Sequence, residues 1–317
     1  MYAEPAANAL AAILAGERRA LARAMSAVEN ETDAGKTLLH EVQPHLGRAR
    51  VLGITGPPGA GKSTLVNALI GEWLARGARI GVVAVDPSSP FSGGAILGDR
   101  IRMGEHQAHE RVFIRSLASR GHGGGLSRTT ARVIDLFDAA GYDHIIVETV
   151  GAGQSEVAVA EVADTRLVVC PPGLGDEVQA LKAGILEIAD ILVVNKADLP
   201  LADRTERELL GMLSLHRYEV WTPQVVRTIA TSGEGVPELA DLIERHAAAC
   251  VSQRFSHGGR VRRLIAASAS DWLKRRIETL DTVEFEQLCA LVRSGELDYA
   301  SADLCAVELA LQAGKKA

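Results

Sequence analysis

A glycine-rich run in the first quarter of the chain combines the residue types that bind phosphate groups. The run has the sequence GPPGAGKST and consists of Gly56, Pro57, Pro58, Gly59, Ala60, Gly61, Lys62, Ser63 and Thr64. An apolar segment, Val51–Ile54, precedes it and a helical pattern follows, which predicts backbone N–H groups that attract an anion at a helix N-terminus. In such a loop the lysine, Lys62, reaches the β- and γ-phosphates and the serine, Ser63, ligates Mg²⁺. The run therefore predicts a nucleoside triphosphate site, with a plain glycine-rich turn as the alternative.

Three carboxylates follow this phosphate-binding loop (P-loop) at positions that predict magnesium binding. Asp86 ends the apolar run Ile80–Asp86, and Glu148 ends the run His144–Glu148. Ligands bind outside the carboxyl ends of parallel strands, so both side chains are candidate magnesium ligands and catalytic groups. Asp99 lies in a glycine-rich segment that we interpret as a switch loop, and it is a candidate ligand in one nucleotide state. The alternatives are a strand-end turn for Asp86 and an ordinary surface loop around Asp99.

The residues after Glu148 predict slow hydrolysis. Gly151 is placed to donate its backbone N–H to the γ-phosphate. The next residue is Ala152, where Ras-like proteins have a glutamine that orients the attacking water, and Gln154 is out of register. We therefore expect a slow intrinsic rate, which suits a regulatory switch better than a metabolic enzyme.

Asn195, Lys196 and Asp198 form an NKxD motif at the end of the apolar run Ile191–Asn195. The Asp198 carboxylate can accept hydrogen bonds from both N1–H and the exocyclic amine of guanine, a donor pair that adenine does not present. The motif therefore predicts GTP and GDP as ligands, with Lys196 along the base and Asn195 bracing the P-loop. The backbone N–H of Ala230 is a candidate donor to guanine O6, although its loop also fits a turn and helix cap.

Two further residues have weaker signals. Lys182 follows a charged, flexible loop and is a candidate mobile cation in catalysis or partner binding, with an ordinary helix-surface position as the alternative. His122 lies in a glycine-rich loop without a second His or Cys paired to it, so we interpret it as an ordinary loop residue. The four cysteines have no CxxC spacing, which favours reduced thiols.

The elements that must position these residues are short apolar runs that alternate with helical patterns. Candidate strands are Val51–Ile54, Ile80–Asp86, Val112–Arg115, His144–Glu148, Thr165–Cys170, Ile191–Asn195 and Val225–Thr228. Several are apolar on both faces, which predicts an α/β fold with a doubly wound, mostly parallel sheet. We expect an N-terminal helical extension over 1–48, a P-loop GTPase domain over 49–250 and a C-terminal helical arm over 251–317.

Composition gives no support for a nucleic-acid or membrane partner. The formal net charge of -6 gives no electrostatic reason to bind nucleic acid or an anionic membrane. Charged residues interrupt the N-terminal apolar pattern, so neither a signal peptide nor a spanning helix is predicted. A cytoplasmic protein is the expectation.

Together these motifs closely resemble the MeaB/ArgK/MMAA family of P-loop GTPases. The resemblance rests on the P-loop, the NKxD motif, DPSS at 86–89, GGAILGD at 93–99, ETVGAGQSE at 148–156 and GDE at 175–177 with Lys182. It runs from the N-terminal helices to the loop at 232–235. The C-terminal arm matches more in position and helical character than in residues.

The resemblance implies a G-protein chaperone of an adenosylcobalamin-dependent acyl-CoA mutase. It also implies a homodimer through the C-terminal helices, gating of cofactor loading, release of damaged cofactor, and a GTPase that the mutase stimulates. The third switch of the family falls on 172–182, which favours a functional role for Lys182. Methylmalonyl-, isobutyryl- and 2-hydroxyisobutyryl-CoA mutase all stay open as partner, and the sequence has no obvious cobalamin-binding motif.

Two competing functions differ in the residues that they require. A GTP-driven metallochaperone for a nickel or cobalt enzyme predicts His- or Cys-rich tracts near the switches, and the sequence has none. A nucleotide-dependent kinase would need an acceptor pocket and would have little use for an NKxD motif.

Overall fold

The computed structural model describes residues 6–86, 104–118, 123–149, 159, 161–173, 189–215, 217–218, 220–249 and 257–314. The chain divides into two compact units, residues 1–263 and residues 264–317. The three-part domain division expected from the sequence stays a prediction.

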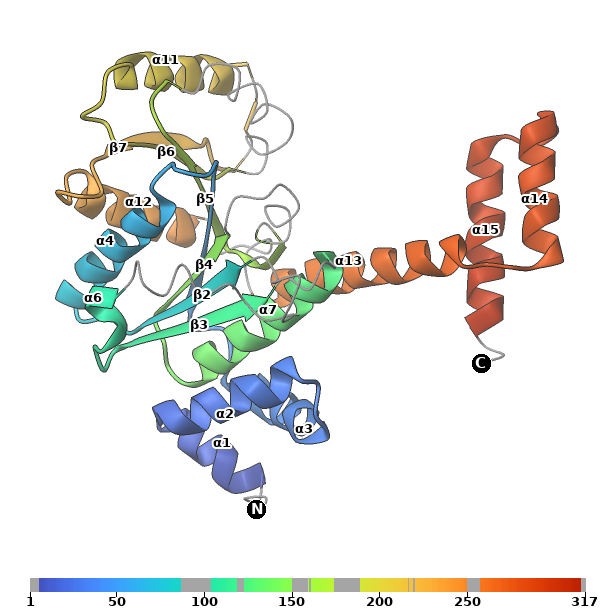
Figure 1. Cartoon of the computed structure of the whole chain (residues 1–317), viewed down its shortest axis with the longest axis horizontal. Helices are drawn as coiled ribbons and strands as arrows, with labels where there is room; N and C mark the ends of the chain where they lie inside the picture. Colours follow the sequence, from blue (N-terminus) through green and yellow to red (C-terminus); the bar gives the residue numbers. More distant parts are fainter. Residues whose placement is uncertain are drawn as a thin grey trace. The chain divides into compact units, whose positions relative to one another are not determined.

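A parallel sheet of seven strands forms the centre of the larger unit (Figure 1). The strands are β1 (Arg50–Thr55), β2 (Ile80–Asp86), β3 (Val112–Ala118), β4 (His144–Thr149), β5 (Thr165–Cys170), β6 (Ile191–Asn195) and β7 (Gln224–Thr228). Their order is β3-β2-β4-β1-β5-β6-β7, and every pairing is parallel. All seven predicted strands are confirmed. The strand order reverses next to β1, and this is the place where doubly wound sheets bind ligands.

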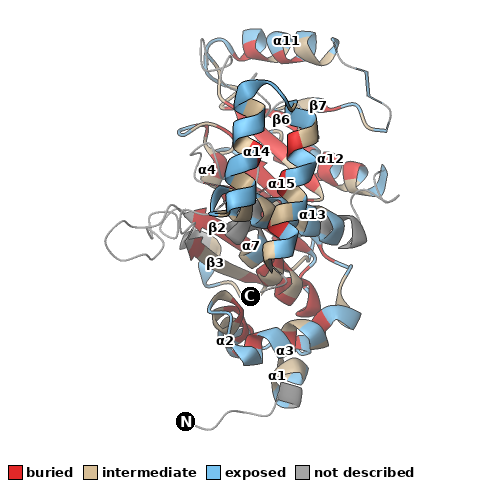
Figure 2. Cartoon of the chain, turned by 90° about the vertical axis from the view of Figure 1, so that its right-hand side faces the viewer, coloured by how far each residue is buried: buried red, intermediate tan, exposed pale blue. Residues whose placement is uncertain are grey.

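Apolar side chains cover both faces of the sheet, which explains why its strands lack an alternating polar pattern. On β5, Leu167 and Val169 belong to the core beneath α4 (Lys62–Ala75) and α12 (Val236–Ala249). The intervening Val168 and Cys170 pack on the opposite face. Successive strand residues point to opposite faces, so a strand covered on both sides is apolar throughout. Figure 2 shows buried residues in red along the labelled strands of the sheet.

Helices cover both faces of the sheet (Figure 1). One face carries α4 and α12, and the other carries α7 (Gly123–Ala139) and α11 (Ala202–Leu213). The short helix α6 (Gly104–Gln107) contacts α4 and β3. The face with α4 is relevant to function because the N-terminus of this helix begins inside the GPPGAGKST run.

The N-terminal segment is helical, as its periodicity predicts. It forms α1 (Ala6–Leu14), α2 (Arg18–Glu29), α3 (Asp33–Val42) and the 3₁₀ turn η1 (Gln43–His45). α2 ends at Glu29, and Thr32 then caps α3 by accepting a hydrogen bond from the N–H of Gly35 at 3.1 Å. These helices pack on α7.

The smaller unit consists of helices. α13 (His257–Glu278) runs into it from the larger unit, and α14 (Val283–Ser294) and α15 (Tyr299–Gly314) form a helical hairpin. The hairpin core is small, with Leu288, Ala302 and Ala306 as its buried apolar residues. Figure 2 shows long exposed stretches on both helices of the hairpin. Among the described helices, none has the length and apolar character needed to cross a membrane.

Candidate functional site

The P-loop joins β1 directly to α4, and two of its glycines are required by close contacts. Gly56 has a φ of +143°, and a Cβ there would lie 2.3 Å from the carbonyl oxygen of Val169. Gly61 has a φ of +87°, and a Cβ there would lie 2.5 Å from Nδ2 of Asn195. A side chain at either position would force the loop away from its neighbours. Gly56 and Gly61 therefore allow the backbone of the P-loop to lie against Val169 and Asn195.

The ammonium group of Lys62 lies inside the loop that it follows. Its Nζ donates to the carbonyl oxygens of Gly56 at 2.8 Å and Pro57 at 3.1 Å, and the residue is buried. Pro58 is exposed, and Thr64 is exposed in the first turn of α4. The backbone of the P-loop thus holds the ammonium group of Lys62 in place. The P-loop pattern predicts that this group contacts the β- and γ-phosphates.

Ser63 and Glu148 bring the two predicted magnesium-binding motifs into contact. The Ser63 hydroxyl donates to Oε1 of Glu148 at 2.7 Å. This contact follows from the sheet, because β1 pairs with β4 in a register that places Ile54 beside Glu148. A hydroxyl and a carboxylate are oxygen ligands of the kind Mg²⁺ binds, so this donor pair fits the ion. Their roles as ligands stay predictions.

Asp86 ends β2 at the same edge of the sheet. β2 lies beside β4, and the register pairs Val85 with Thr149. The backbone of Asp86 is therefore one strand away from Glu148, and β4 separates it from the P-loop strand β1. The side chain of Asp86 lies outside the described residues, so its part in magnesium binding stays a prediction.

The NKxD motif is joined to the P-loop by two side chains. Asn195 is buried and its Nδ2 donates to the carbonyl oxygen of Ala60 at 2.9 Å. Lys196 has a φ of +59°, and its Nζ donates to the carbonyl oxygen of Gly59 at 2.9 Å. The phosphate loop and the predicted base-binding motif thus share hydrogen bonds although they lie far apart in sequence.

Thr228 is a positioning residue that the sequence reasoning did not find. Its hydroxyl donates to Oδ1 of Asn195 at 3.1 Å, and the backbone N–H of Ala230 donates to the same oxygen at 3.3 Å. The β6 and β7 register pairs Asn195 directly with Thr228. A polar residue ending the strand next to the NKxD strand is the signal that could have found it. The predicted donation from Ala230 to guanine O6 would have to share or replace the bond to Asn195.

Asp198 is exposed, as a base-binding carboxylate must be before its ligand arrives. It lies in a tight turn in which the N–H of Leu199 donates to the carbonyl oxygen of Lys196 at 3.0 Å. The N–H of Ala197 donates to the carbonyl oxygen of Thr228 at 3.1 Å, which fixes the turn against β7. The guanine contact itself stays a prediction.

Three predicted site residues lie outside the described residues, namely Asp99, Gly151 and Lys182. The same holds for His122, Ala152 and Gln154. Within the described ranges, no group of three or more His, Cys, Asp and Glu side chains is arranged to hold a metal ion. Burial raises the pKa of the Cys170 thiol to about 12, so this cysteine at the end of β5 is an inert core residue.

Comparison with known proteins agrees with this arrangement. The family model for "Methylmalonyl Co-A mutase-associated GTPase MeaB" matches residues 21–282. A Pyrococcus horikoshii protein whose name includes the word GTPase is 44% identical over 301 residues, which span 91% of this chain and 93% of that protein. The Escherichia coli GTPase ArgK is 37% identical over 273 residues, spanning 83% and 81% of the two chains. A solved structure described as a LAO/AO transport system kinase has a TM-score of 0.73 at 28% identity and covers 97% of this chain and 99% of its own.

A P-loop, a carboxylate at the end of β4 and an NKxD motif on one parallel sheet define a P-loop GTPase. The extent of the family match makes the assignment specific. The chain belongs to the MeaB family of methylmalonyl-CoA mutase-associated GTPases. The predicted family and the predicted GTPase class are thereby confirmed.

Proposed function

We propose that this protein is a chaperone that hydrolyses GTP and acts on an adenosylcobalamin-dependent acyl-CoA mutase of the methylmalonyl-CoA mutase type. Its GTP cycle would gate cofactor loading and support release of damaged cofactor. Membership of the family carries the proposal, since the description of that family names association with methylmalonyl-CoA mutase. A mouse relative, 41% identical over 248 residues that span 72% of this chain and 60% of that protein, is named for methylmalonic aciduria type A.

The chemistry proposed for the site is phosphoryl transfer to water, in which positioning and charge stabilisation supply most of the rate. Lys62 would leave the carbonyl oxygens of Gly56 and Pro57 for the β- and γ-phosphates. Ser63 and Glu148 would hold Mg²⁺, with Asp86 and Asp99 as further ligands. The ion, when bound, would neutralise charge on the phosphate oxygens.

Base recognition would depend on the contacts that hold the NKxD turn. Asn195 is bonded to Ala60, Thr228 and Ala230, so the turn and the P-loop move as one structure. Asp198 would then accept both guanine donors, and the stem of Lys196 would lie along the base. Because the turn is preorganised, little conformational entropy is lost when GTP binds.

We propose that GTP hydrolysis is regulated by residues that enter the nucleotide site only when a partner protein is bound. Ala152 replaces a water-orienting glutamine, so the intrinsic rate is expected to be slow. Gly151 would contact the γ-phosphate, and Lys182 would enter the site when the mutase binds. If the rate of GTP hydrolysis rises when the mutase binds, the nucleotide state depends on whether the mutase is bound.

A homodimer through the C-terminal helices is supported by exposed apolar side chains on α14 and α15. Val283, Tyr299 and Leu304 are 71%, 79% and 71% exposed. The hairpin has a small core of its own, and a small unit of this kind usually gains stability from a partner surface. A second copy of the chain is the proposed partner.

The test of the chaperone function is cofactor loading. Apo forms of methylmalonyl-, isobutyryl- and 2-hydroxyisobutyryl-CoA mutase would be mixed with adenosylcobalamin, this protein, and GTP, GDP or a non-hydrolysable GTP analogue. Holoenzyme formation would be followed by absorbance. We expect one mutase to load at a rate that depends on the nucleotide. If no mutase responds to the protein in any nucleotide state, the chaperone proposal is wrong although the GTPase assignment stands.

A further inference from the structure

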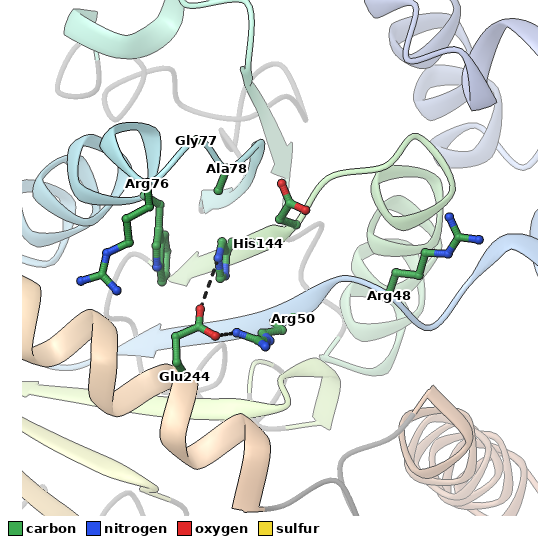
Figure 3. A pocket seen from close by; sticks show the side chains of 9 residues that line it. Arg48, Arg50, Arg76, Gly77, Ala78, His144 and Glu244 are labelled. Atoms are coloured by element: carbon green, nitrogen blue, oxygen red, sulfur yellow. Dashed lines mark ion pairs between the residues drawn. The ribbon is translucent and has the colours of Figure 1, made fainter.

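The polar side chains at the two ends of β1 and β4 differ in how they are paired. At the starts of these strands lies the pocket in Figure 3, where Glu244 of α12 forms an ion pair with Arg50 and its Oε1 lies 3.4 Å from Nε2 of His144. At the other ends, the hydroxyls of Thr55 and Thr149 are buried and have no hydrogen-bond partner among the described residues. Only 2% of Thr55 and 0% of Thr149 is exposed. The end of the sheet that carries the nucleotide site therefore holds two buried polar groups whose pairing needs an explanation.

Thr55 and Thr149 lie side by side on the face of the sheet opposite α4. The register pairs Ile54 with Glu148, so the next residues along the two strands, Thr55 and Thr149, are neighbours as well. Glu148 contacts Ser63 of α4, and successive residues of a strand point to opposite faces. The two threonine side chains therefore share the face that α7 covers.

The two hydroxyls interrupt a row of side chains that is otherwise apolar. The register places Val85 of β2 beside Thr149 and Val168 of β5 beside Thr55. Valine differs from threonine in lacking the hydroxyl, so packing alone does not require threonine at 55 and 149. A buried hydroxyl without a hydrogen bond destabilises the fold, because it has lost its bonds to water. The pair therefore indicates a partner that is not a side chain of the described residues.

A third buried hydroxyl comes from α7. Thr130 is 2% exposed, and its hydroxyl also lacks a partner among the described residues. Phe137, seven residues later on the same face of α7, lies against Gly81 near the start of β2. Since α7 joins two parallel strands, it runs against their direction, and seven helical residues rise about 10 Å, the length of about three strand residues. Thr130 is therefore level with residues 84–85 of β2, beside Thr149.

We propose that Thr55, Thr130 and Thr149 hold one buried water molecule behind the nucleotide site. A water molecule in a protein interior typically makes about three hydrogen bonds, to polar groups that are otherwise unpaired. Each hydroxyl can donate a hydrogen bond to such a water or accept one from it, so the three threonines supply the partners that it needs. The water joins β1, β4 and α7 at one point.

This water positions the residues next to the threonines. Thr55 directly precedes Gly56, the first residue of the P-loop, and Thr149 directly follows Glu148. Fixing the backbone at Thr149 fixes the direction of the Glu148 side chain, which accepts from the Ser63 hydroxyl at 2.7 Å on the other face. Groups that orient a metal ligand raise the affinity for the metal. Thr149 is therefore a positioning residue for magnesium if Glu148 holds Mg²⁺, as the proposed function requires.

The direct test is a crystal structure of the GDP complex at a resolution that shows ordered water. We expect density for one water molecule within hydrogen-bonding distance, about 2.5–3.0 Å, of at least two of the three hydroxyls. The proposal is overturned if no water lies there, or if the hydroxyls bond to protein groups instead.

Urea unfolding of Thr149→Val measures whether the hydroxyl is paired. If it bonds to a water, valine leaves the water and the other hydroxyls short of a partner, so the urea midpoint should fall. If it is unpaired, valine removes a buried polar group and the midpoint should rise, which overturns the proposal. Thr37→Val is the control, since the Thr37 hydroxyl is exposed on α3 and bonds to the carbonyl oxygen of Asp33. It should leave the midpoint nearly unchanged.

Magnesium dependence separates positioning from stability. The Mg²⁺ concentration for half-maximal GTP turnover should rise about tenfold in Thr149→Val, the low end of the effect of groups that orient metal ligands. Thr149→Ser keeps the hydroxyl and should restore the value of the unsubstituted protein. An unchanged Mg²⁺ requirement in Thr149→Val overturns the positioning role. If turnover of the unsubstituted protein does not depend on Mg²⁺, the proposed role of Glu148 fails, and the crystal density and the urea midpoint still decide whether the water is bound.

Discussion

The side-chain amide of Asn195 donates a hydrogen bond to the carbonyl oxygen of Ala60, 135 residues earlier in the chain, at 2.9 Å. One buried side chain therefore links the strand that presents the base-binding motif to the loop that holds the phosphates. The same side chain accepts from Thr228 and Ala230 through its oxygen. Both ends of its amide group are satisfied, which fixes its orientation.

The first expectation concerns this link. Asn195→Ala leaves the Thr228 hydroxyl and the Ala230 N–H without their acceptor and removes one of the two side-chain links between the P-loop and the NKxD turn. We expect affinity for both GDP and GTP to fall by at least about tenfold. Fluorescent GDP displacement measures the change. Asn30→Ala, at an exposed residue that bonds only within α2, is the control and should bind normally. Unchanged affinity in Asn195→Ala would show that the link has no part in binding.

The second expectation separates guanine from adenine. Asp198→Asn replaces an acceptor by a group that presents a donor toward the base. GTP affinity should fall by about 100-fold, because a site built for two hydrogen bonds is left with unpaired groups. Competition binding with GTP and ATP gives the ratio. If Asp198→Asn prefers GTP over ATP as strongly as the unsubstituted protein does, Asp198 does not recognise the guanine base.

The third expectation concerns hydrolysis. Lys62→Ala removes the buried ammonium group held over the P-loop. Turnover should fall by at least about 1000-fold, because a preorganised charge at the phosphates is lost. Phosphate release measured at saturating GTP tests this. If Lys62→Ala hydrolyses GTP at the rate of the unsubstituted protein, the reaction takes place elsewhere in the molecule.

The fourth expectation is a pH dependence of stability that originates at His144. Its folded pKa of about 4 lies below the ordinary value of 6.5, so the unfolded chain binds a proton more readily. The free energy of unfolding should therefore be highest above about pH 6.5 and fall by about 3 kcal/mol as the pH approaches 4. The charged groups that face this ring are Arg50, Arg76, Asp143 and Glu244.

Urea unfolding of the parent and of His144→Phe at pH 7 and pH 4 measures this contribution. Phenylalanine keeps an aromatic ring against Trp73 and removes the titration. The variant should lose less stability over this range than the parent does. His40→Phe, at an exposed position on α3, should behave like the parent. Equal losses in the parent and His144→Phe would assign the effect to other groups.

The sheet and much of the nucleotide site could be predicted because local patterns determine them. Strands buried on both faces are continuous apolar runs, and β2, β5 and β6 have the bounds that those runs indicate. The P-loop and NKxD motif have fixed spacing and chemistry, so their residue types were sufficient. The bond from Asn195 to the P-loop follows from placing both motifs at one edge of the sheet.

What could not be predicted depends on strand order and register. Thr228 reaches Asn195 only because β7 lies beside β6. A second example is Asp190, which binds the guanidinium of Arg166 at 2.9 and 2.8 Å and lies near His246. Burial raises the pKa of Asp190, but hydrogen bonds from His246 and Arg166 outweigh burial and hold it below its usual value. No local sequence pattern predicts this cluster, because Asp190, Arg166 and His246 come from separate elements.

GTP hydrolysis that responds to a mutase is the property on which the proposed chaperone function depends most. GTP turnover should be measured with the protein alone and with each purified acyl-CoA mutase, with Lys62→Ala as the background. We expect slow turnover alone and a rise of at least about tenfold with one mutase, because a partner completes the site. A rate of GTP turnover that is the same with and without methylmalonyl-, isobutyryl- and 2-hydroxyisobutyryl-CoA mutase would contradict the proposed chaperone function.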